Sequence, residues 1–486
     1  MSSNLKESYR PSIHGSNFIT NTTYQTTRLT GKLIEETFLA VETKAHCKGF
    51  ERLIEAVSPN AFYDSDNRAD PPMCHPNTRV AVINKIIGWA NGMIDTDACF
   101  LWLYGPAGAG KTAIARKVAE FFAEHRLLLA SFLFFRSDPK RNTMTPLVAN
   151  IAYSVACAIP GAREPIDAAI EADPLIFSYS LDVQFTKLFF EPLRLLVDQG
   201  HFLDRQLPRL VVIDGLDECL DKTAQANLIR FLSSSMDRYH LQLTFLIISR
   251  PEAHITSAVT LASEQSTFSR LELNNDFRPD EDIHRFLTDK FVEIKICHHF
   301  HAHIPFSWPS EKQLQTLVRK ASGQFIYASL AMRFVNSACD SPMRQLDIVL
   351  GLRPPISPDL PFAELDALYR YILSCTKNID LALHIIALDD ILWEDLDKDI
   401  FKGIEAILGL EDGDVHIHLS PLSSLLDVRK NSINFYHSSF MDFLRTPERS
   451  ADYHIDAQKN RSLVVQYMLG VFTRNGRCSL FLVNWY

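Results

Sequence analysis

The chain has 486 residues, of which 47% are apolar and 22% are charged, and its formal net charge is −9. These values are typical of globular proteins and argue against a disordered or fibrous chain. The acidic balance also argues against a protein that wraps nucleic acid, because contacts to phosphates need a concentrated basic surface.

The cysteines and the N-terminus indicate where the protein works. Its nine cysteines are scattered and form no C-x-x-C pair, a usage typical of a reducing compartment. Residues 1–10 are polar and lack the apolar stretch of a secretory signal. No apolar run approaches the ~20 residues that a membrane-spanning helix needs. We therefore expect a cytoplasmic protein without a membrane span.

The N-terminal part of the chain predicts little packed structure. Residues 1–30 are rich in Ser, Thr and Asn and predict a disordered tail. Within it, residues 13–27 are nearly uncharged, a composition that can also stack as cross-β. Residues 31–78 predict a helical lead-in and then a linker rich in Pro and Asn, after which a helix begins near Thr78.

Residues 79–275 alternate between strand and helix patterns. A helix is predicted over 111–125, and continuous apolar runs predict buried strands at 99–104, 129–135, 210–213 and 243–248. Apolar strands separated by helices are typical of a parallel sheet that is covered on both faces.

The strand signals fade after Pro279. Residues 276–376 carry helical spacing and predict a helical domain. Residues 377–450 predict helices, short strands at 415–419 and 433–436, and a further helix. A C-terminal helical segment is expected over residues 451–486.

The clearest motif follows the first predicted strand and opens the next helix. It matches G-x-x-x-x-G-K-T, and its residues are Gly105, Pro106, Ala107, Gly108, Ala109, Gly110, Lys111 and Thr112. In a P-loop the glycines let backbone N–H groups surround the β-phosphate, the lysine reaches the β- and γ-phosphates, and the hydroxyl can bind Mg²⁺. The strand and helix on either side favour this reading over a Gly-rich turn that happens to carry Lys-Thr.

Two further strand ends carry charged residues. Asp214 ends the third strand, where a carboxylate can hold Mg²⁺, and Asp217 and Glu218 follow on a turn from which a carboxylate could activate water. Arg250 follows the fourth strand and is a candidate sensor of the γ-phosphate. The alternatives are a solvated acidic turn and a surface arginine paired with a carboxylate.

Taken together, GPAGAGKT, LVVIDGLDEC and IISRPE resemble the NACHT-type NTPases of the signal-transduction ATPase class, which includes the NOD-like receptors. The narrower resemblance is to a large set from mushroom-forming fungi, whose P-loop domain is like the N-terminal domain of nephrocystin 3. It extends over about residues 49–470 and includes SGQFIYA at 322–328 and HSSFMDFL at 437–444. It implies an α/β P-loop NTPase fold, followed by a helical domain (276–376) and a winged-helix domain (377–450).

The resemblance also implies site residues outside the P-loop domain. A winged-helix histidine of such relatives contacts the β-phosphate of ADP, and His437 lies at the matching place; the alternative is a core histidine. Relatives stack a proline on adenine, but here Phe325 follows Gly323-Gln324, so Phe325 stacks instead or base recognition differs. No guanine-specific motif is present, which favours ATP over GTP.

The implied function is a switch of intracellular signalling that binds ATP or ADP with Mg²⁺. ADP would hold the three domains closed, ATP would release the winged helix and allow self-oligomerisation, and slow hydrolysis would reset the switch. The winged helix would then be a clamp and not a reader of nucleic acid. Two alternatives stay open: a truncated or non-catalytic scaffold, since relatives usually carry a C-terminal repeat sensor, and a metabolic P-loop kinase.

A histidine-rich segment, Cys297–His303, is the remaining metal candidate. Adjacent histidines on an irregular segment rarely converge on one ion, and no second ligand cluster accompanies them. We therefore expect a loop here.

Overall fold

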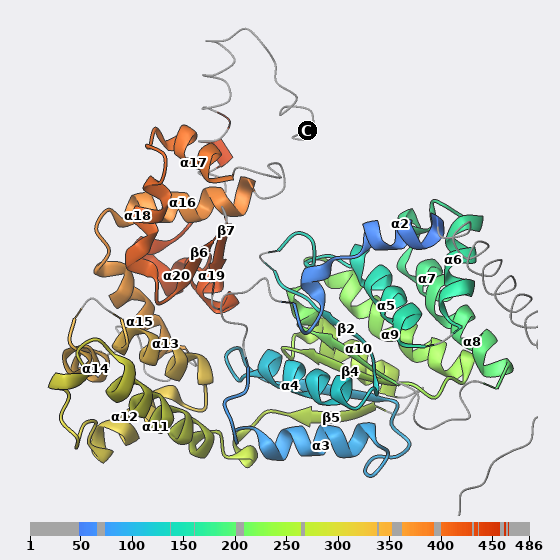
Figure 1. The fold of residues 1–486 in the computed structure, drawn as a ribbon, viewed down its shortest axis with the longest axis horizontal. Helices are drawn as coiled ribbons and strands as arrows, with labels where there is room; N and C mark the ends of the chain where they lie inside the picture. The colour runs from blue at the N-terminus through green and yellow to red at the C-terminus, as the bar shows by residue number, and fades with distance from the viewer. Residues whose placement is uncertain are drawn as a thin grey trace, which may run out of the picture.

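The computed structural model describes residues 48–65, 73–136, 138–159, 161–200, 209–263, 268–337, 340–351, 362–392, 400–429, 432–435, 437–456, 461–462 and 465. The predicted tail (1–30) and most of the C-terminal segment (451–486) lie outside these residues. Figure 1 shows the sheet with its helices on the right, a helical region at the lower left and a smaller mixed region above it.

A five-stranded parallel sheet forms the centre of the first domain, in the order β2-β3-β4-β1-β5. Its strands are β1 (Phe100–Tyr104), β2 (Leu128–Leu133), β3 (Leu210–Asp214), β4 (Thr244–Ser249) and β5 (Phe268–Glu272). Four of them confirm the strands expected from the apolar runs. Strand β4 lies between the strand that leads into the P-loop and the strand that ends at Asp214, so its tip lies between the two motifs.

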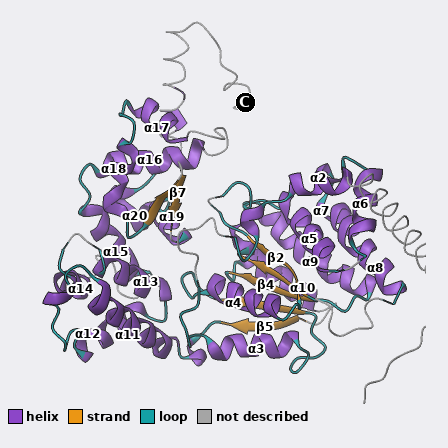
Figure 2. Ribbon diagram, in the orientation of Figure 1, coloured by secondary structure: helices purple, strands orange, loops and turns teal. Residues whose placement is uncertain are grey.

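Helices cover both faces of this sheet (Figure 2). Because side chains alternate along a strand, Phe100 and Trp102 join one core and Leu101 and Leu103 the other. The second core is closed by α3 (Val80–Ala90) and α4 (Lys111–Glu124). The first is closed by α5 (Thr145–Ala158), α9 (Lys222–Tyr239) and α10 (Ala253–Ser263). An outer layer packs on α5; it consists of α2 (Lys48–Ala56), α6 (Arg163–Ala172), α7 (Leu181–Phe185), a π-helical turn (Thr186–Phe190) and α8 (Glu191–Asp198).

Strand β5 was not expected from the sequence. It is the edge strand next to β1, and in Phe268-Ser-Arg-Leu-Glu272 only Leu271 is fully buried. A strand that buries one residue lacks the continuous apolar run by which its neighbours were recognised.

The helical region begins with the long helix α11 (Pro279–Cys297). It continues with α12 (Glu311–Ala321), α13 (Phe325–Val335), α14 (Pro342–Gly351) and α15 (Ala363–Ser374). The loop before α3 anchors α11 to the first domain: Arg79 N–H donates to Asp282 (2.8 Å), and His75 Nε2 lies 2.7 Å from Asp289.

The third region has three helices followed by the antiparallel hairpin of a winged helix and two short helices, which completes the expected fold class. Its elements are α16 (Ile379–Leu392), α17 (Ile400–Leu408), α18 (Asp414–Leu419), β6 (Leu426–Arg429), β7 (Ser432–Phe435), α19 (Ser438–Leu444) and α20 (Pro447–Ser450).

The strand predicted at 415–419 is wrong, because this segment is helix α18. Its apolar residues alternate with histidines, which is a strand pattern. In the structure Val415 and Leu419, four positions apart, are buried, whereas Ile417 is 66% exposed. Burial on one helical face therefore overrides the alternation.

The helical and winged-helix regions share one continuous apolar core. Tyr369 of α15 is buried against Phe440 and Phe443 of α19, and its hydroxyl lies 3.0 Å from that of Ser439. Helix α19 therefore has a fixed position relative to the helical region.

Candidate functional site

The P-loop connects β1 to α4 and has the curvature of an anion site. Gly108 and Gly110 have φ of +76° and +87°, values that residues with a Cβ rarely adopt. Gly110 is the residue before α4, so the first N–H groups of that helix face the loop. Backbone N–H groups at a helix N-terminus attract phosphate through their partial positive charge.

Lys111 is the first residue of α4, and its ammonium group folds back over the loop. It donates hydrogen bonds to the carbonyl oxygens of Gly105 (2.9 Å) and Pro106 (2.8 Å). Burial lowers the pKa of Lys111 to about 8; Asp217 opposes this shift, and Arg250 adds to it. A cation that has lost part of its hydration gains more than an exposed lysine when a phosphate approaches.

Thr112 and Asp214 form the part of the site that suits Mg²⁺. Asp214 is 1% exposed at the end of β3, and burial raises its pKa to about 7, while a hydrogen bond with the Thr112 side chain lowers it. Among the residues that the structure describes, Asp214 Oδ1 is a buried oxygen without a hydrogen-bond partner. A carboxylate oxygen left unpaired beside a threonine hydroxyl fits the oxygen ligands of Mg²⁺.

The two carboxylates after Asp214 have different surroundings. Asp217 is committed to Arg250: Oδ1 accepts the Arg250 backbone N–H (2.8 Å), and Oδ2 lies 3.2 Å from Arg250 Nε. Glu218 lines the cavity, and one of its oxygens accepts the backbone N–H of Arg136 (3.1 Å). Asp217 therefore positions Arg250, and both carboxylates line the cavity.

Arg250 also contacts the winged-helix region. Its Nη2 lies 2.9 Å from Asp442 Oδ2 in α19. Burial acts to lower the pKa of Arg250, but Asp442 and then Asp217 outweigh it, so the pKa is raised. The predicted sensor therefore lies between the phosphate site and another domain.

The helical region approaches the P-loop at the start of α13. A Cβ on Gly108 would overlap the Ile326 side chain, and the Ile326 N–H points to the Gly108 carbonyl at 3.4 Å. Phe325 precedes this contact and lines the cavity. The Arg79 guanidinium lies 4.9 Å over its ring and donates to the Ala109 carbonyl, so Arg79 covers one face of the predicted base-stacking residue.

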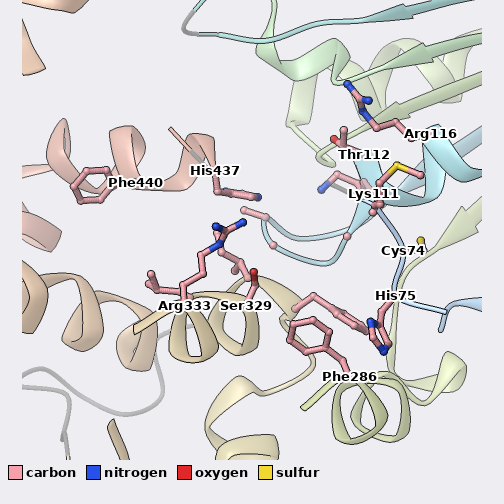
Figure 3. A pocket seen from close by; sticks show the side chains of 18 of the residues that line it. Cys74, His75, Lys111, Thr112, Arg116, Phe286, Ser329, Arg333, His437 and Phe440 are labelled. Atoms are coloured by element: carbon pink, nitrogen blue, oxygen red, sulfur yellow. The ribbon is translucent and has the colours of Figure 1, made fainter. Parts of the chain in front are cut away.

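His437 lies between β7 and α19, as expected, and its ring extends toward the P-loop (Figure 3). Its Nδ1 accepts the backbone N–H of Ser439 (2.9 Å) and thereby caps α19. A neutral imidazole that accepts at Nδ1 carries its proton on Nε2. This tautomer puts the ring N–H at Nε2, a type of donor from which a phosphate oxygen can accept.

These residues surround one cavity of about 680 Å³. Figure 3 shows Lys111 and Thr112 on one side, His437 and Arg333 opposite, and His75 and Phe286 at the lower end. The cavity brings together nearly all predicted site residues: its walls include Ala107, Gly108, Gly110, Lys111, Thr112, Asp214, Asp217, Glu218, Arg250, Phe325 and His437.

Sequence reasoning assigned no role to Arg79, Arg136 or Asp442. Arg79 and Asp442 stand in segments that the family resemblance includes, but nothing in their spacing shows that they approach the site. Arg136 lies just beyond the end of β2, where only the sheet order places it beside Asp217.

The histidine-rich segment forms the end of α11 and a short 3₁₀ turn (His301–His303). In the described part of the chain, no three His, Cys, Asp or Glu side chains cluster as a metal site. No single described helix has the length and apolar character of a membrane span; Ala363–Ser374 and Ile379–Leu392 reach them only as a pair bent by 113°.

Comparison with known proteins identifies the first domain. Residues 84–250 match the family model described as Nephrocystin 3, N-terminal. No curated protein gives a significant match.

Solved structures are only distantly similar. A signal transduction ATPase with a tetratricopeptide repeat sensor, from Pyrococcus horikoshii, is 12% identical with a TM-score of 0.40; the match covers 78% of this chain and 44% of that protein, less than half its length. Cdc6p from Pyrobaculum aerophilum is 14% identical with a TM-score of 0.32, and the match covers 83% of this chain and 97% of that one.

The assignment of the first domain rests on the family match together with the P-loop and the sheet order. Residues 84–250 therefore lie within a P-loop NTPase domain of the NACHT type, similar to the N-terminal domain of nephrocystin 3.

Proposed function

We propose that this chain is a nucleotide-dependent switch that ADP holds closed and ATP opens, with slow hydrolysis returning it to the closed state. The observation that supports this most strongly is the cavity: the P-loop, α13 and His437 line it together, so one ligand would contact all three regions. Its volume of about 680 Å³ lies within the usual range of ligand pockets.

The residues around the phosphates have separable roles in this proposal. The P-loop N–H groups and Lys111 bind the phosphates, and Thr112 and Asp214 are the residues that would hold Mg²⁺, which would supply positive charge to the phosphates. Glu218 accepts a proton from the attacking water, and Asp217 keeps Arg250 in place.

His437 makes closure depend on the nucleotide. Because Nδ1 accepts from the Ser439 N–H, the neutral ring carries its proton on Nε2, and in the proposed closed state this group donates to the β-phosphate of ADP. Nucleotide binding and closure then stabilise each other by the same free energy. Once α19 is released, surfaces buried in the closed form become available for self-association, which is how ATP would promote oligomers.

The first test is to purify the protein and identify any bound nucleotide by mass spectrometry. The second compares dissociation constants for ADP and ATP in wild type, His437→Leu and His437→Asn. Leucine has no donor, and the amide of the shorter asparagine does not extend as far as Nε2 of the imidazole, so with either substitution the loss of one charged hydrogen bond, about 2 kcal/mol, should weaken ADP about thirtyfold relative to ATP.

The asparagine variant is the matched control for capping. Asparagine is a good N-cap residue, so His437→Asn should keep the melting temperature near that of wild type, whereas His437→Leu lowers it. If His437 only caps α19, the asparagine variant will bind ADP like wild type, and the clamp role must be given up.

A further inference from the structure

Asp442 lies between two arginines of the NTPase domain. Its Oδ2 is 2.9 Å from Arg250 Nη2, and its Oδ1 is 3.6 Å from Arg136 Nη1. Each carboxylate oxygen thus faces a different guanidinium. The Asp442 side chain is only 17% exposed, so solvent screens these pairs less than it screens pairs at an open surface.

Both arginines are also fixed from within their own domain. Asp217 holds Arg250 through both oxygens, and its backbone carbonyl accepts from Arg136 Nη2 (3.0 Å). The guanidinium groups therefore have defined positions before α19 arrives. Arg250 is the one that also lines the nucleotide cavity, beside Lys111 and Glu218.

The sheet order determines which phosphate Arg250 can meet. Arg250 follows β4, which lies between β1 and β3, so it stands between the P-loop and Asp214. The β-phosphate is held by the P-loop, and the γ-phosphate extends beyond it toward the strand tips. A third phosphate group would therefore lie near the guanidinium that now faces Asp442.

We propose that Asp442 determines whether the closed form accepts a diphosphate or a triphosphate: its carboxylate occupies Arg250 and Arg136 when the nucleotide ends at the β-phosphate, and a γ-phosphate competes with it for them. This inference rests on the proposed nucleotide switch. It assigns the discrimination to a residue outside the NTPase domain.

Charge explains why the two anions compete. Asp217, Glu218 and Asp442 already place three carboxylates around Arg250 and Arg136. A γ-phosphate adds further negative charge to this partly buried cluster, and like charges there repel strongly. The carboxylate that can leave is Asp442, because Asp217 and Glu218 belong to the NTPase domain itself.

Helix α19 links this competition to the rest of the site. It begins after His437 and carries Asp442, and its seven residues form about two turns. Displacing Asp442 therefore also moves His437, which lines the cavity. Breaking the pairs between Asp442 and the two arginines therefore weakens the contact between His437 and the nucleotide, so a γ-phosphate would release both.

The experiment measures dissociation constants for ADP and for a non-hydrolysable ATP analogue, with Mg²⁺, by titration calorimetry. Asp442→Asn keeps the shape but removes the charge, and should tighten the analogue about tenfold while leaving ADP unchanged or weaker, because the variant also loosens the contact that holds α19. If the Asp442→Asn variant does not fold, the same measurement is made on Asp442→Ser.

Asp390→Asn is the matched control. Asp390 pairs with Arg445, the residue after α19, at 2.6 Å, and this pair lies within the winged-helix region. Its loss should leave the ratio of the two constants unchanged. Equal changes for ADP and analogue in Asp442→Asn, or none, would overturn the inference. If wild type binds neither nucleotide, the proposed switch fails instead.

Discussion

A methyl group added to Gly108 tests the contact between the P-loop and the helical region. The Cβ of Gly108→Ala would overlap Ile326 and lie 3.1 Å from its Cβ. Ile326 is 8% exposed and β-branched, so rotation about χ1 gives little relief. The start of α13 must therefore move away from the loop.

Gly110→Ala separates this overlap from backbone strain. Both glycines have positive φ, which costs an alanine about 1–2 kcal/mol, but in the described part of the chain no atom beyond the neighbouring backbone lies within 4 Å of a Cβ at Gly110. Overpacking adds about 1–3 kcal/mol at Gly108 alone. This additional cost at Gly108 should weaken the contact between α13 and the P-loop.

Hydrogen exchange followed by mass spectrometry measures this attachment in the nucleotide-free protein. The Ile326 N–H points to the Gly108 carbonyl, so the peptide around residues 324–330 reports the contact directly. Gly108→Ala should accelerate its exchange about 5- to 150-fold, and Gly110→Ala should not. In an Ile326→Ala background the overlap with the isoleucine Cγ2 is gone and only the 3.1 Å approach of the two Cβ atoms remains, so adding Gly108→Ala should accelerate exchange much less. Acceleration of the same size in that background would refute the reasoning.

Three further predictions concern single side chains. Lys111→Ala should weaken ATP about 10- to 150-fold, since one charged hydrogen bond contributes ~1.5–3 kcal/mol; unchanged affinity by calorimetry would contradict the P-loop assignment. Glu218→Gln should bind ATP normally but release phosphate more slowly, and if Asp217→Asn has this effect instead, the two carboxylates have exchanged roles. Asp389 is 5% exposed, and burial raises its pKa well above the ordinary value. Its contribution to stability is therefore present below the unfolded pKa and lost as pH rises, so Asp389→Asn should raise the urea midpoint at pH 7 but not at about pH 4.

The sequence predicted the parts of the site that are encoded locally. The P-loop and Asp214 each follow a continuous apolar strand, so a short window contains both the ligand-binding residue and the element that positions it. Asp442 is different: it contacts Arg250 across 192 positions, and the packing of separate regions of the chain brings the two residues together. Strand β5 was not predicted for a different reason: at the edge of the sheet it buries too few side chains to show an apolar run.

The regions that would have to part are joined at separate places. Helix α11 is tied to the loop before α3, α13 touches the P-loop, and α19 holds Arg250. Free energies of well-separated contacts add, so the probabilities that each is broken at the same moment multiply. With about 1.4 kcal/mol per contact, each one lowers spontaneous opening about tenfold. Spontaneous opening is therefore rare, because thermal motion alone seldom breaks every contact at once.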